Sequence, residues 1–285
     1  FQPALESAER FARIPGAEAR GHLLLATLHN ELDNSAEAIK ELEKVLQLEP
    51  EAKHLRVSPA YVFYFYGSGL QRLGRSDEAL APLTRSLELE RNAETYVAIG
   101  RVHADLGDAT QADRALRQAL EVDPMQSEAR ELLAIAALED DDAVKALDWL
   151  VPLTRPPTGA AASIGLPTVG SSTAFLLQQA YARAGDAVEA EKWRAHAERV
   201  RKTESLIKIV NDVLRVAPAS MWGRAIRAHA AAFANEWVEA EELASVIGAE
   251  DRTAQPFLDK LIAAIEARDQ QSLPGFELLP VDLYD

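Results

Sequence analysis

Residues 61–90 read YVFYFYGSGLQRLGRSDEALAPLTRSLELE, and residues 94–124 read ETYVAIGRVHADLGDATQADRALRQALEVDP. The two segments share one pattern, because Gly67 and Gly74 of the first return as Gly100 and Gly107 of the second, 33 residues later. Apolar residues recur at intervals of three and four in both segments, which is typical of amphipathic helices. A repeat of this length indicates stacked copies of one helical hairpin.

The repeated positions are those at which two paired helices need a small or turn-forming residue. Each segment has a Gly in the first helix, a Leu-Gly pair at the turn and an Ala early in the second helix. These residues are Gly67, Leu73, Gly74 and Ala79, then Gly100, Leu106, Gly107 and Ala112, with Pro124 as the end of the unit. The pattern resembles the tetratricopeptide repeat. The resemblance implies an all-α fold, a right-handed superhelical solenoid of helix-turn-helix hairpins.

The same frame continues on both sides of the two segments, with less regular turns. An earlier unit spans residues 22–50, and degenerate units follow from Ser127, Ser172 and Trp222. Their matching positions are Ala26, Leu32, Asp33, Ala38 and Pro50; Leu133, Ala134, Asp140 to Asp142 and Ala146; Tyr181, Gly185 and Ala190; and Ala228, Asn235 and Ala240. We also expect one long helix from about Val188 to Val216, because no residue breaks the helical pattern before Pro218.

These units predict the organisation of the whole chain. The first and the last unit of a solenoid each need a capping helix, because each unit buries its apolar face only against its neighbours. We expect a partial repeat or capping helix in residues 1–16, four repeats in 17–155, a Gly/Pro-rich inter-repeat loop in 156–171, degenerate repeats with a long helix in 172–250, and a capping helix with a tail in 251–285. The tail is either an ordered strap or a mobile end.

Composition narrows the classes of function. The formal net charge is −15, which disfavours nucleic-acid binding and docking on anionic lipids. The chain has no Cys, so disulfides and thiolate metal sites are excluded. No apolar run approaches the length of a membrane span, and we therefore expect a soluble protein with no membrane insertion. The compartment stays open, with the cytoplasm slightly favoured over export. Because the chain begins at Phe1, we expect it to be a piece of a longer protein.

Several apparent sites have simpler explanations. Residues 165–172 superficially resemble a phosphate-binding loop, but the loop has no Lys and no expected strand before it. His22 and His29 lie seven residues apart on one expected helix, at positions where helices pack, so a zinc site is disfavoured. The acidic run Glu139 to Asp142 is interpreted as a turn followed by a helix cap. We expect no catalytic residues, no metal and no cofactor.

The resemblance implies where a partner would bind. In this family the first helices of successive units line a concave groove, and five positions of each first helix face a bound peptide. Those positions hold Tyr61, Tyr64, Ser68, Gln71 and Arg72; Glu94, Val97, Arg101 and Asp105; Glu131 and Ile135; and Phe175, Gln179 and Arg183. An alternative is that Tyr61, Tyr64 and Phe65 merely pack against a neighbouring helix or the C-terminal tail.

The expected function is a scaffold or adaptor that binds a protein or peptide. Leu23 and Thr27 occupy positions where the family's carboxylate-clamping Lys and Asn would stand, so capture of an acidic C-terminus is disfavoured. Two alternatives stay open: a self-association module that forms homo-oligomers, and a regulatory domain of a larger protein whose catalytic part lies elsewhere.

Overall fold

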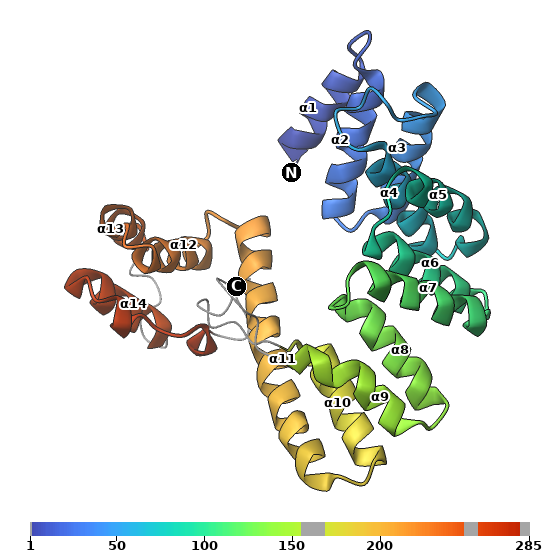
Figure 1. The fold of residues 1–285 in the computed structure, drawn as a ribbon. Helices are drawn as coiled ribbons and strands as arrows, with labels where there is room; N and C mark the ends of the chain where they lie inside the picture. The colour runs from blue at the N-terminus through green and yellow to red at the C-terminus, as the bar shows by residue number, and fades with distance from the viewer. Residues whose placement is uncertain (1, 155–168, 248–255, 280–285) are drawn as a thin grey trace. The chain divides into compact units, whose positions relative to one another are not determined.

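The computed structural model describes residues 2–154, 169–247 and 256–279. These residues are predominantly helical and contain no strand, which confirms the predicted all-α fold of successive helical hairpins (Figure 1). The chain divides into two compact units, residues 1–169 with 176–190, and residues 170–175 with 191–285. Each unit is described by itself.

The helices follow one another in antiparallel pairs. The first unit contains α1 (Gln2–Ala12), α2 (Glu18–Glu31), α3 (Ser35–Leu48), α4 (Pro59–Arg72), α5 (Ser76–Leu89), α6 (Ala93–Asp105), α7 (Ala109–Val122), α8 (Ser127–Glu139), α9 (Ala143–Leu150) and the short η1 (Val151–Thr154). Residues of α10 (Ser171–Arg183) and α11 (Ala187–Val216) belong to both units. The second unit continues with α12 (Met221–Phe233), α13 (Trp237–Ser245), α14 (Pro256–Ala267), η4 (Gln270–Ser272) and η5 (Phe276–Leu278).

A single left-handed residue closes each hairpin turn. The residues are Asp33, Gly74, Gly107, Asp141, Gly185 and Asn235, with φ between 58° and 83°. After Gly107, for example, the Asp108 N–H donates to the His103 carbonyl at 2.8 Å, while the Gly107 N–H donates to Ala104 at 3.0 Å. This pair of bonds is the Schellman motif, which satisfies the last carbonyls of a helix. The three turns without a Gly therefore use Asp33, Asp141 and Asn235 for the same geometry.

The residue that follows each turn starts the second helix, in several cases with a side-chain cap. Asp108 and Asp142 accept the backbone N–H of Gln111 and Lys145, each at 3.0 Å. Such caps satisfy donors that a helix start leaves unpaired. The acidic run Glu139 to Asp142 is thus a turn plus a cap, as the sequence analysis proposes.

Small residues allow the two helices of a hairpin to approach closely. The Ala five positions after each left-handed residue is buried: Ala38, Ala79, Ala112, Ala146, Ala190 and Ala240. A Cβ built on Gly67 would lie 2.6 Å from Leu83 Cγ and 3.1 Å from the Ala79 carbonyl oxygen. At Gly100 the same atom would lie 2.8 Å from Leu116 Cδ2. A side chain at either position would therefore require the facing Leu83 or Leu116 to move.

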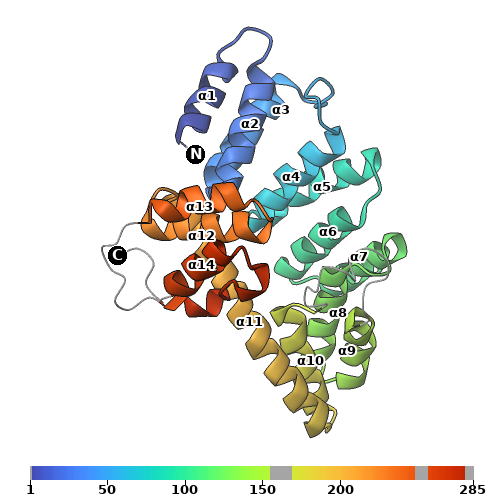
Figure 2. The same ribbon diagram turned by 90° about the vertical axis from the view of Figure 1, so that its left-hand side faces the viewer.

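The hairpins of the first unit stack on one another and share an apolar core. Ile39, Leu42, Leu70 and Leu83 are almost fully buried in one continuous cluster that extends from α2 to α6. Both views show α2 to α7 as successive neighbouring pairs (Figures 1 and 2). Stacking therefore places the first helices α2, α4 and α6 next to one another.

The C-terminal tail packs on the second unit. Leu273, Phe276 and Leu279 join the apolar cluster of α12 and α14, and His229 Nε2 lies 3.0 Å from the Pro274 carbonyl oxygen. Burial lowers the pKa of His229, although the hydrogen bond to Pro274 opposes this shift. The neutral imidazole can donate that hydrogen bond. Residues up to 279 thus form an ordered strap, while residues 280–285 lie outside the described residues.

The boundaries given above for the repeats, the inter-repeat loop and the C-terminal cap are not tested by the structure and stay a prediction. Residues 156–168 of the loop lie outside the described residues, as do residues 251–255 at the start of the predicted cap.

The close contact at Gly67 gives the first testable prediction. An open helical Gly gains about 0.5–1 kcal/mol of stability on replacement by Ala. Gly67→Ala should instead lower the free energy of unfolding by about 1–3 kcal/mol, because Leu83 must move. In a Leu83→Ala background the same replacement should become neutral or stabilising. Urea denaturation of the four proteins measures this coupling, and an unchanged cost in the Leu83→Ala background would contradict the contact.

The turns give a second prediction, of opposite sign at two equivalent positions. A left-handed conformation costs a non-Gly residue about 1–2 kcal/mol. Gly107→Ala should therefore lower the free energy of unfolding by about 1 kcal/mol. Asp141→Gly should raise the free energy of unfolding, by at least a few tenths of that amount. Thermal denaturation of both variants tests the assignment; a lower melting temperature for Asp141→Gly would show that Asp141 contributes something other than the turn geometry.

Candidate functional site

A cavity of about 280 Å³ opens in the first unit where first helices of successive hairpins meet. We call it the first cavity. Its walls come from α2, α4, α6 and the beginning of α8. Of the predicted groove residues, Tyr61, Tyr64, Ser68, Gln71, Arg72, Glu94, Val97 and Arg101 line it. The stack therefore brings together side chains that lie in different repeats of the sequence.

Aromatic side chains of α4 form one wall. Phe65 is buried, whereas Tyr61 keeps 47% of its surface exposed, with the two ring centroids 6.0 Å apart. Tyr64 is partly buried, and this burial, followed by the nearby charges of Glu128 and Glu94, raises its pKa. Phe65 is thus a core residue, while the two tyrosines present apolar rings and neutral hydroxyl groups to the cavity.

Charged and amide groups form the rest of the lining. Arg101 Nη1 lies 2.9 Å from Glu128 Oε1, and both side chains remain well exposed. Arg72 donates a hydrogen bond to the amide oxygen of Asn30. Exposed ion pairs contribute only about 0–1 kcal/mol. A ligand can therefore replace the partner of Arg101 at small cost, which suits a binding surface better than a structural one.

Of the other six predicted groove residues, Asp105 and Ile135 line a neighbouring cavity of the same unit, and the remaining four lie elsewhere. Glu131 is on α8 and lines no part of the first cavity. Gln179 is on α10, and Arg183 donates a hydrogen bond to the Leu138 carbonyl, so its guanidinium already binds its own chain. Phe175 is 54% exposed and belongs to the second unit. The role of these four residues in binding stays a prediction.

Some lining residues were missed by sequence reasoning. Asn30 ends α2, and Gln126 and Glu128 stand where the chain enters α8. Gln126 also caps α8, since its side chain accepts the Ala129 N–H at 2.8 Å. In the repeat frame Asn30 is equivalent to Gln71, and Glu128 is equivalent to Glu94, so the groove pattern extended to these two units would have found both. Gln126 lies outside that pattern. Pro124, two residues before Gln126, was the sequence signal that a helix starts nearby.

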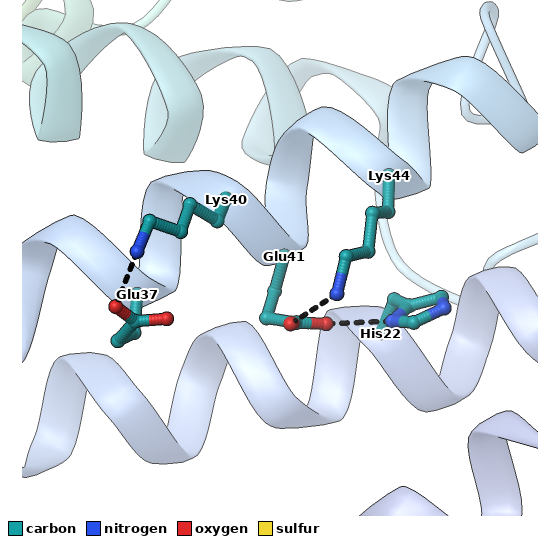
Figure 3. Close-up of polar contacts among 5 residues, drawn as sticks. All are labelled: His22, Glu37, Lys40, Glu41 and Lys44. Carbon is teal, nitrogen blue, oxygen red and sulfur yellow. Dashed lines mark hydrogen bonds and ion pairs between the residues drawn. The ribbon is translucent and has the colours of Figure 1, made fainter.

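His22, considered above as one of two potential metal ligands, has a structural partner. His22 Nδ1 lies 2.6 Å from Glu41 Oε2, and Lys44 donates to Oε1 of the same carboxylate at 2.7 Å (Figure 3). Burial raises the pKa of Glu41, but the hydrogen bonds from Lys44 and His22 outweigh it, and the net pKa lies below the ordinary value. The group ties α2 to α3. Among the described residues no cluster of three or more His, Asp or Glu could hold a metal ion.

Comparison with known proteins identifies the repeat. The model of the tetratricopeptide repeat matches residues 19–51 and 93–124, so the chain contains repeats of this family. No curated protein matches the chain.

Solved structures share the fold at low sequence identity. The type IV pilus biogenesis factor PilW is 16% identical, with 77% of this chain and 87% of that chain covered and a TM-score of 0.54. PilF of Pseudomonas aeruginosa is 16% identical, with 86% of this chain and 90% of that chain covered and a TM-score of 0.51. At such identity the likeness extends to the fold alone. Within the described part of the chain, no helix combines the length and apolarity that a membrane span needs.

The Glu41 contacts give a third prediction. Glu41→Gln should lower the free energy of unfolding at pH 7 by about 1.5–3 kcal/mol, the range for hydrogen bonds to a charged group. Because the folded-state pKa is depressed, this contribution is present above the unfolded-state pKa and is lost as pH falls through the folded-state value. Urea denaturation between pH 7 and pH 3 should therefore show the wild type and the variant converging.

The neighbouring pair Glu37 and Lys40 supplies the control. Their charged atoms lie 2.6 Å apart, but both side chains are largely exposed (Figure 3). Glu37→Gln should lower the free energy of unfolding much less than Glu41→Gln, because solvent screens an exposed ion pair. Equal costs for the two variants would contradict a special role of Glu41.

Proposed function

We propose that the chain is a non-catalytic interaction scaffold that binds a peptide segment of a partner protein in the first cavity. The observation that carries the proposal is the convergence of exposed Tyr61 with partly buried Tyr64 and Arg101 on one concave site. Tyr and Arg are enriched among residues that dominate binding energy at interfaces. Their side chains supply apolar area together with hydrogen-bond donors.

The construction of the site supports a peptide ligand. The side chains stand on helices that are fixed by a buried core, so the cavity is formed before any partner arrives. A preformed site saves the ordering cost that weakens many interactions. Polar groups such as Ser68, Gln71 and Asn30 line the same cavity, where they can bind the backbone of an extended segment.

Self-association is a second candidate, favoured by a separate surface. In the second unit Phe233, Val238 and Val246 keep 64%, 66% and 57% of their surface exposed, beside the partly buried Trp237. Adjacent exposed apolar residues are common at sites where proteins associate. Light scattering distinguishes the two: a mass of two or more chains that Val238→Glu reduces to one would favour self-association.

The fourth prediction tests the cavity itself. The double variant Tyr61→Ala/Arg101→Ala should weaken binding of the partner at least about 10-fold, since two hot-spot side chains are removed. Helicity and melting temperature should change little, because both side chains are substantially exposed. The measurement is a quantitative pull-down from native lysate with the wild type and the double variant side by side.

Arg114→Ala, at an exposed position of α7 outside the cavity, is the matched control. It should retain every protein that the wild type retains. Capture of the same proteins by the double variant would refute the cavity as the binding site, and unfolding of the double variant would show that the side chains are structural.

A further inference from the structure

A second cavity, of about 500 Å³, adjoins the first in the same unit. It lies between the hairpin of α6 and α7 and the helix α8. Buried Leu116 and Leu133 form its floor, and exposed Ala104, Ala136 and Ile135 form its sides. Ligand pockets typically have volumes of about 300–1,000 Å³ and mainly apolar linings. The second cavity meets both criteria.

Sparse packing between two first helices accounts for this opening. α4 and α6 contact each other directly, whereas α6 and α8 make fewer such contacts. The facing side chains are small, with Ala104 on α6, Ala109 and Ala112 on α7, and Ala136 on α8. Short side chains leave a gap that the helices do not close, because α8 is held in place by its own packing on α7 and α9. The gap thus belongs to the rigid stack.

Two residues join the cavities into one groove. Gln71 and Arg101 line both of them. Gln71 Nε2 donates to Asp105 Oδ2 at 2.7 Å, and Arg101 pairs with Glu128 at 2.9 Å. These two contacts therefore form a polar divider between a compartment with tyrosines and a compartment with aliphatic side chains. A single bound segment that crosses the divider would reach both.

The charges around the groove determine which kind of segment it favours. The acidic side chains outnumber the basic ones: Glu94, Glu128, Asp105, Asp113 and Glu139 against Arg72 and Arg101. Asp113 is neutralised by Arg117, at 2.6 Å, whereas Glu94 and Glu139 have no ion-pair partner among the described residues. A positively charged segment is attracted to such a surface.

The same charges disfavour two other occupants. A second copy of the chain would bring a formal charge of −15 to an acidic groove. The chain's own C-terminal segment FELLPVDLYD carries three acidic residues and no basic one, and its described part already packs on the second unit. Like charges that meet across an interface cost binding energy. A segment of another protein remains as the occupant.

We propose that the second cavity is an anchor site for an aliphatic side chain of the bound peptide, with a Lys or Arg of the same peptide next to Glu139. This inference rests on the proposed function and specifies the ligand: a basic segment with one aliphatic anchor, whose other part contacts Tyr61 and Tyr64. The aliphatic side chain buries its surface against Leu116, Leu132 and Leu133. The basic side chain stays at the rim, where its charge sets specificity and association rate.

The test begins with a displayed library of random 12-residue peptides, panned on the full chain. The enriched peptides should share Leu, Ile, Val or Met within a few positions of Lys or Arg. A synthetic peptide with the shared sequence is then titrated. Ala136→Phe fills the second cavity and should weaken binding at least about 10-fold, equivalent to about 1.4 kcal/mol. Enrichment of acidic peptides, or of peptides without an aliphatic residue, would overturn the proposal.

Charge reversal gives an independent readout. Glu139→Lys should weaken the basic peptide about 3- to 10-fold at low salt and less at high salt, because exposed charges are screened. A peptide with its basic residue changed to Glu should bind Glu139→Lys better than it binds the wild type. Ala81→Phe, at an exposed position of α5 outside both cavities, should change nothing.

The outcomes separate this inference from the proposed function. Peptides that lose affinity on Tyr61→Ala/Arg101→Ala but not on Ala136→Phe or Glu139→Lys would overturn the anchor site and leave the scaffold function standing. Failure of the library to enrich any peptide on the wild type relative to the double variant would overturn both. Matching melting temperatures of the variants and the wild type exclude unfolding as the cause of a loss.

Discussion

The close approach of two helices, set by a left-handed turn residue and a buried Ala five positions later, is the constraint on which the other features depend. The turn reverses the chain and satisfies the last carbonyls of the first helix. The Ala, near the start of the second helix, carries only a methyl group and so lets the pair approach closely. Gly67 and Gly100 repeat this requirement on the first helices. Each hairpin consequently has one geometry, and identical geometry allows hairpins to stack.

Stacking explains how a binding site arises from helices that are individually ordinary. Tyr61, Arg101 and Glu128 belong to three different repeats, yet they meet because α4, α6 and α8 follow one another in the first unit. The first helices are not equally close, since α4 and α6 contact each other directly whereas small side chains face the gap between α6 and α8. The second cavity lies in that gap, so a groove with two chemically different compartments results from one repeated fold.

The hairpins could be predicted from the sequence, because helical periodicity and turn glycines depend on neighbouring residues. Most residues of the first cavity were implied only by the resemblance to the repeat family. Asp141 and Asn235 were harder, since the left-handed conformation of a non-Gly residue depends on the surrounding packing. The ten residues from Glu49 to Ser58 form the connection between α3 and α4 and contain the buried Leu55. They carry no periodic signal in the sequence. The opening of the second cavity could not be predicted, because the spacing of α6 and α8 is a property of the stack. Four of its lining residues are nevertheless predicted groove positions: Gln71, Arg101, Asp105 and Ile135.

Photo-crosslinking in native lysate tests the central claim most directly. A photoreactive residue is placed at Ser68, which lines the first cavity, or at Ala81, an exposed position on α5 away from it. The account predicts a covalent adduct with a partner peptide from position 68 and none from position 81. Adducts from position 81 alone, or equally from both positions, would contradict a groove-binding scaffold.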